Sequence, residues 1–132
     1  MTHKIKTFKL IHLAICTGVI LAYIFSGQFT IAQLTAQEIN SHDLVFLAIP
    51  FGAFFLSNFM FKSQLKKINS SASIEEKLPV YQTASIIRWA ILEGAAFIIL
   101  FLKPNLLIFG IFLIFYLIYL RPTEEKIVSN FE

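Results

Sequence analysis

The sequence is short of charged residues. Only 14% of its 132 residues are Asp, Glu, Lys or Arg, whereas 57% are hydrophobic. Soluble globular domains carry about 25% charged residues. The few charges also gather in short stretches, so they cannot cover a whole surface with polar groups. Together with a mean hydropathy of +0.73, this shortage excludes an ordinary soluble domain and predicts an integral membrane protein.

Cysteine and the usual catalytic motifs are also scarce. Cys16 is the only cysteine, which excludes a disulfide within the chain. The sequence has no phosphate-binding loop, no dinucleotide-binding glycine motif and no HExxH zinc motif. His3, His12 and His42 are spread over the basic head, the first span and the first outer loop, so we expect them to form no metal site. We therefore expect no enzymatic activity, no cofactor and no metal.

Four apolar runs are candidates for transmembrane helices, which need about 20 residues each. We predict an all-α fold, an integral membrane four-helix bundle, that makes a single domain of residues 1–132. The spans are expected at about 8–25, 44–61, 80–102 and 106–120. The fourth run is short, so its flanking residues must extend it.

Three local patterns refine this expectation. Pro50 lies inside the second span, where a proline removes a backbone hydrogen bond and kinks the helix. Ser73 and Glu76 form a capping box, which predicts a helix that begins near Ile74 and bends at Pro79. The mixed polar and apolar stretch 31–39 favours a short helix at the membrane surface.

The distribution of Lys and Arg predicts the orientation, because short cytoplasmic segments carry an excess of these residues. With the amino terminus inside, the inner segments hold three, four and two of them, whereas the outer segments hold only Lys103. We therefore expect a multi-pass protein of a bacterial-type inner (plasma) membrane with both termini cytoplasmic. This topology explains the basic residues without a nucleic-acid partner.

The first and third spans resemble each other. His12 aligns with Arg88 and Thr17 aligns with Glu93, while Ile, Ala and Gly coincide between 11–18 and 87–94. The match favours two parallel-repeated helical hairpins, related by an axis along the membrane normal as in some transporters. Chance similarity between two apolar runs is the alternative.

Small residues recur at every fourth position of these two spans. In lipid, such residues let helix backbones approach closely. We expect the first and third spans to pack on each other, or to dimerise, through Ala14, Gly18, Ala22, Ala90 and Gly94.

Glu93 is the most unusual residue of the chain. It lies ~14 Å from the outer end and ~20 Å from the inner end of its span, where an ionised acid costs on the order of 3 kcal/mol or more. Arg88 lies five residues earlier, too far around the helix to pair with it. We therefore expect an intramembrane polar cluster of Glu93, Arg88, His12 and Asn58.

Two functions fit these features. The first is a non-enzymatic helper or subunit that self-associates or packs on a larger membrane partner. The alternative is a small proton- or ion-coupled transporter that uses Glu93 as its carrier, with Arg88 tuning the carboxyl group. An intramembrane acid supports either role, since it needs a partner or a path to water.

Overall fold

The computed structural model describes residues 2–26, 41–68, 71, 73–102, 106–123 and 125–127. Every regular element within these ranges is helical, which confirms the predicted all-α class for them. The elements are α1 (Thr2–Phe25), the 3₁₀-helix η1 (Ser41–Leu47), α3 (Ala48–Leu65), α4 (Ile74–Leu102) and α5 (Leu107–Tyr119). The surface helix predicted at 31–39 falls outside the described residues.

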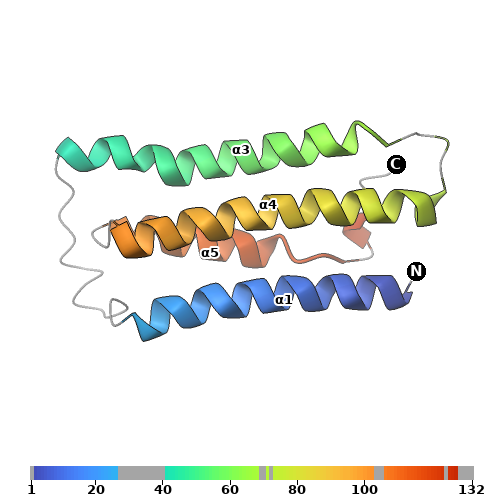
Figure 1. The fold of residues 1–132 in the computed structure, drawn as a ribbon, viewed down its shortest axis with the longest axis horizontal. Coiled ribbons are helices and arrows are strands. Elements are labelled where there is room, and N and C mark those ends of the chain that lie inside the picture. Colours follow the sequence, from blue (N-terminus) through green and yellow to red (C-terminus); the bar gives the residue numbers. More distant parts are fainter. Residues whose placement is uncertain are drawn as a thin grey trace.

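The helices lie lengthwise beside one another, and α4 packs against each of the other three (Figure 1). α1 and α4 run in one direction, whereas α3 and α5 run in the other (Figure 1). The first and third predicted spans are therefore parallel. The beginning of α1 and the helical turn at 125–127 lie at the same end of the bundle as the end of α3 and the beginning of α4.

Three helical segments are long and apolar enough to cross a membrane: Ile5–Phe25, Ser41–Leu65 and Glu75–Leu102. Only 22% to 39% of their apolar windows is buried inside the bundle. Most of the remaining apolar surface therefore faces outward, as the exposed rings of Phe55 and Phe59 illustrate.

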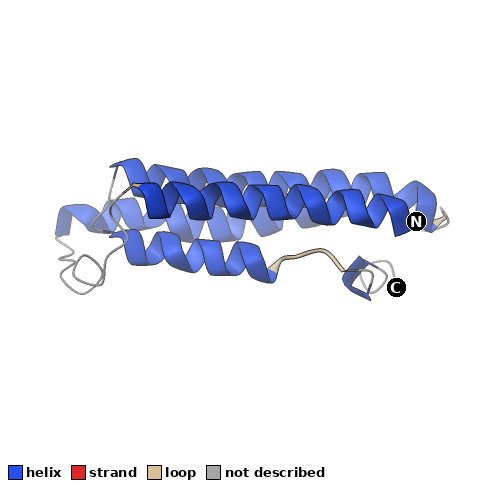
Figure 2. Cartoon of the chain, turned by 90° about the horizontal axis from the view of Figure 1, so that it is seen from below, coloured by secondary structure: helices blue, strands red, loops and turns tan. Residues whose placement is uncertain are grey.

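α5 is shorter than the other three helices. Its 13 residues extend about 20 Å, less than the ~30 Å hydrocarbon core of a bilayer. It stops before the basic end of the bundle, and the chain continues as an extended segment toward a helical turn at 125–127 (Figure 2). Ile127 in this turn is completely buried, so the turn packs against the helices.

The local sequence explains where two helices begin. Ser73 caps α4, because its Oγ accepts a hydrogen bond from the Glu76 N–H at 3.3 Å. This confirms the helix start predicted from the capping box, and α4 then continues through Pro79. Pro50 lies in the first turn of α3, directly after η1, where its missing N–H costs little. α3 thus continues as an α-helix through Pro50, and the part of the predicted span that is not α-helical is the 3₁₀-helix η1 before it.

The core is built from side chains spaced three or four residues apart on each helix. On α1 the buried positions are Ile5, Phe8, His12, Cys16, Val19 and Tyr23. Two of them contact Trp89 of α4, which is completely buried: Phe8 stacks on its ring at 5.0 Å and His12 meets it edge-on. His12 is therefore part of the core.

Candidate functional site

Side chains satisfy the last carbonyl groups of α5. The final four carbonyls of a helix have no partner within the helix. His12 Nε2 donates to the Leu117 carbonyl oxygen at 2.7 Å. Lys126 Nζ donates to the Tyr119 carbonyl oxygen at 2.8 Å. The backbone N–H groups of residues 120 and 121 serve the other two carbonyls. The end of α5 is therefore capped by groups that are distant in the sequence.

His12 lies in a small buried cluster. Its ring meets the Trp89 ring edge-on, with centroids 4.7 Å apart. Its Nε2 lies 3.5 Å from Cys16 Sγ. The buried indole N–H of Trp89 has no acceptor among the described residues. Because Nε2 donates to a carbonyl group, the ring proton of His12 is held at that nitrogen.

Arg88 points toward α3. Its guanidinium carbon lies 3.7 Å from the centroid of the Phe61 ring, a cation–π contact. Its Nε is buried and has no hydrogen-bond partner among the described residues. The charge of Arg88 is therefore directed away from the α1 side of α4.

Asn58 of α3 forms a polar bridge to α5. The Tyr116 hydroxyl lies 2.9 Å from Asn58 Nδ2 and 3.1 Å from Asn58 Oδ1. The Asn58 amide also donates to the Phe54 carbonyl oxygen at 2.8 Å. This bridge is a specific polar link between α3 and α5.

Glu93 lies on the side of α4 that faces α1. Trp89 and Ala96 are each one helical turn away from it, and both contact α1: Trp89 meets His12, and the Ala96 carbonyl oxygen accepts from Tyr23 Oη at 2.7 Å. Glu93 is partly exposed. No ion pair or hydrogen bond to Glu93 occurs in the part of the chain that the structure describes.

The four residues of the predicted polar cluster thus form two groups. His12 and Glu93 lie on the α1 side of α4, whereas Arg88 and Asn58 contact residues of α3 and α5. Sequence reasoning places Tyr116 near a span end, where amphipathic rings favour the membrane interface, but does not pair it with Asn58, although a tyrosine hydroxyl in an apolar run needs a hydrogen-bond partner. That requirement is the signal that could have paired it with Asn58.

The small residues of α1 and α4 do not form a close contact within the chain. A Cβ atom added at Gly18 or Gly94 would meet no heavy atom within 4 Å. Ala14 and Ala90 are exposed. Sequence reasoning instead overlooked Gly110 of α5, where an added Cβ would collide with the Tyr23 hydroxyl. Of the predicted small-residue positions, Ala14, Gly18 and Ala90 are thus exposed, whereas Ala22 and Gly94 are partly buried.

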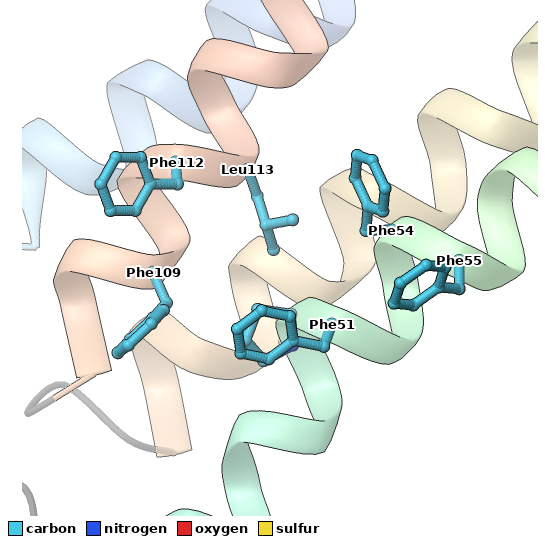
Figure 3. Close-up of a pocket in the computed structure, with 7 residues that line it drawn as sticks. Phe51, Phe54, Phe55, Phe109, Phe112 and Leu113 are labelled. Carbon is cyan, nitrogen blue, oxygen red and sulfur yellow. The ribbon is translucent and has the colours of Figure 1, made fainter.

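A separate apolar cavity of about 530 Å³ lies between α3 and α5. Figure 3 shows phenyl rings from both helices around it, among them Phe51 and Phe109, whose centroids are 6.3 Å apart. Its lining residues are Pro50, Phe51, Phe54, Phe55, Phe109, Phe112 and Leu113. Such a lining can contact apolar groups, but it provides neither an acid nor a base nor a nucleophile.

No group of three metal-ligating side chains occurs among the residues that the structure describes. The chain matches no protein-family model, no curated protein and no solved structure. The function must therefore be argued from the geometry of these polar and small residues.

Proposed function

We propose that this chain is a small polytopic membrane protein that works as a non-enzymatic helper or subunit. It associates with a second copy of itself or with a larger membrane partner. The contact is made by the association face, which we define as the outer positions Ala14 and Gly18 of α1 with Ala90, Glu93 and Gly94 of α4. The observation that carries the proposal is the partly exposed Glu93 within an apolar helix, directly before Gly94, where an added Cβ would meet no heavy atom within 4 Å.

The exposed apolar surface supports the location in a membrane. Helices of bilayer-spanning length keep most of their apolar surface outside the bundle, which water would not tolerate but lipid does. The beginning of α1, the end of α3, the beginning of α4 and the turn at 125–127 share one end of the bundle. Because the stretches 4–9, 62–77 and 121–126 hold nine of the eleven Lys and Arg residues, we infer that this end lies on the cytoplasmic side of a bacterial-type inner membrane.

The association face combines two features that membrane helices use for contact. Glycine and alanine allow a neighbouring backbone to come close. A carboxyl group away from water is costly unless a polar partner satisfies it. Glu93 lies nine residues before the end of α4, about 14 Å along the helix, so its short side chain does not reach that end. A docked helix with a polar side chain would satisfy it.

The test compares Gly94→Leu with Gly52→Leu. Neither glycine has a heavy atom within 4 Å of an added Cβ, so both variants should keep the fold. Gly52 lies on α3, away from the association face, and serves as the matched control. We expect Gly94→Leu to weaken association about tenfold or more, measured by energy transfer between labelled copies and by retention of a partner on purification. If both variants associate as strongly as the wild-type protein does, the proposal is wrong.

The position of Glu93 also favours a second candidate, a proton- or ion-coupled transporter in which this carboxyl group is the carrier. A carrier predicts that Glu93→Gln abolishes transport while insertion and association persist. A subunit predicts that Glu93→Gln chiefly weakens association. Labelling of Glu93 by a hydrophobic carbodiimide, with protection by a cation, would favour the carrier.

A further inference from the structure

A second cavity, of about 450 Å³, lies where α5 stops short. It is enclosed by one face of α1 and by the extended segment that follows α5, two parts of the chain that are far apart in the sequence. Its lining residues are Lys9, His12, Leu13, Arg121, Pro122 and Thr123. The association face does not contribute to it, so its role does not depend on association, although it rests on the proposed membrane location and orientation.

Two cationic side chains, Lys9 and Arg121, line this cavity and therefore lie at a similar level of the bundle. Lys9 is the last basic residue before the apolar run of α1, and Arg121 is the first residue after the apolar end of α5. Both side chains are exposed. In a bilayer, this level is the boundary between the hydrocarbon core and the headgroups. An anion at this boundary can reach both cations, while an attached chain lies on the exposed Leu13.

Positive charge is concentrated around the cavity. Lys126 lies next to it and donates to the Arg121 carbonyl oxygen at 3.2 Å. Burial, followed by the charges of Arg121 and Arg88, lowers the pKa of Lys126. No Asp or Glu lines the cavity among the described residues, and the nearby Glu125 is exposed. A bound anion would relieve this repulsion between cations.

The helix end beside the cavity does not repel an anion strongly. The carbonyl groups at the end of a helix carry partial negative charge. Here His12 and Lys126 donate to two of them, which neutralises the nearest part of that charge. The cavity thus offers cationic and hydroxyl groups, with the Thr123 side chain on its wall.

We propose that this cavity binds the phosphate group of one anionic phospholipid from the cytoplasmic leaflet. Lys9 and Arg121 pair with the phosphate, and an acyl chain of the lipid lies along Leu13. Basic pockets between membrane helices on the cytoplasmic side bind anionic headgroups in this way. Arg121 is suited to the task because its guanidinium group can hold two phosphate oxygens at once.

The test measures lipid bound to the purified full-length protein by native mass spectrometry. The protein is exchanged from detergent into mixtures of phosphatidylglycerol with phosphatidylcholine as the neutral competitor. We expect one retained phosphatidylglycerol, and a loss of affinity of about fivefold for each cation removed in Lys9→Gln and Arg121→Gln. Lys66→Gln with Lys67→Gln is the matched control, since it removes two exposed charges at the end of α3 and should keep the bound lipid.

A second variant changes the space inside the cavity but leaves its two cations in place. Leu13→Trp keeps both cations but fills the cavity from its exposed edge, so it should also release the lipid while helicity and melting temperature remain unchanged. Equal losses in the cavity variants and in the Lys66/Lys67 control would overturn the site in favour of general surface attraction. Full displacement of the lipid by millimolar inorganic phosphate would overturn the lipid assignment and leave a site for free phosphate.

Discussion

The Tyr23 hydroxyl of α1 occupies the space where a side chain on Gly110 of α5 would begin. From there it donates a hydrogen bond to the Ala96 carbonyl oxygen of α4 at 2.7 Å. Three helices therefore meet around a single phenol group. The absence of a side chain at residue 110 is what allows the ring to lie between them.

This contact makes Gly110→Ala a strong test of the helix packing. The added methyl group must push the buried Tyr23 ring away, so we expect a loss of about 1–3 kcal/mol in unfolding free energy. Titration with a denaturing detergent, followed by circular dichroism, measures it. Gly52→Ala is the control: it has open space and an exposed position, and should be neutral or slightly stabilising. Adding Tyr23→Phe should recover part of the loss, and an unchanged Gly110→Ala protein would contradict the contact.

His12 holds the end of α5, so its removal should loosen that end. In His12→Phe, the Leu117 carbonyl group loses its donor while the apolar volume is kept. We expect a cost of about 1–3 kcal/mol and faster hydrogen exchange in the last turn of α5, read by mass spectrometry. His12→Gln retains a donor and should lose less. The interpretation fails if exchange in that turn is the same for both variants and the wild type.

The bridge between Asn58 and Tyr116 can be measured with a double-mutant cycle. Asn58→Leu and Tyr116→Phe each remove one partner, and the double variant removes both. Hydrogen bonds between membrane helices couple by about 0.6 kcal/mol on average and up to about 1.7, so we expect a coupling energy in this range. Strictly additive losses would show that α3 and α5 are not held together here.

Ile127 packs against the helices although it lies near the end of the chain. Since its side chain is completely buried, Ile127→Ala should cost about 2–4 kcal/mol through lost contacts and a cavity. Thermal unfolding in detergent gives the value. Glu125→Ala, at an exposed neighbouring position, should leave stability unchanged, and similar melting of both variants would argue against a docked C-terminal segment.

The helical class and the positions of the apolar elements follow from the sequence because long apolar runs have few structural solutions. Each of the four predicted spans lies within helical structure or one residue beyond it. The start of α4 was predictable because a capping box acts locally. The 3₁₀ geometry of η1 was not, since Pro50 alone does not decide whether the preceding turn kinks or tightens.

The candidate site was harder to predict because it depends on rotation about the helix axes. Depth along a helix follows from residue counting, and His12 does lie beside Trp89, the residue after Arg88. Which neighbour a side chain faces depends on packing between distant segments. The number of residues along each helix therefore does not predict that Arg88 contacts the Phe61 ring or that His12 donates to the Leu117 carbonyl group.

The shortness of α5 bears on how the protein is synthesised. In the proposed membrane location, a segment of 13 residues is below the length that inserts into a bilayer by itself, so we expect α5 to enter as the second arm of a hairpin with α4. Its last carbonyl groups are satisfied by His12 at the beginning of the chain and by Lys126 near its end. Both caps are thus present only once Lys126 has been synthesised, and chains truncated before Lys126 should be the preferred substrates of membrane proteases.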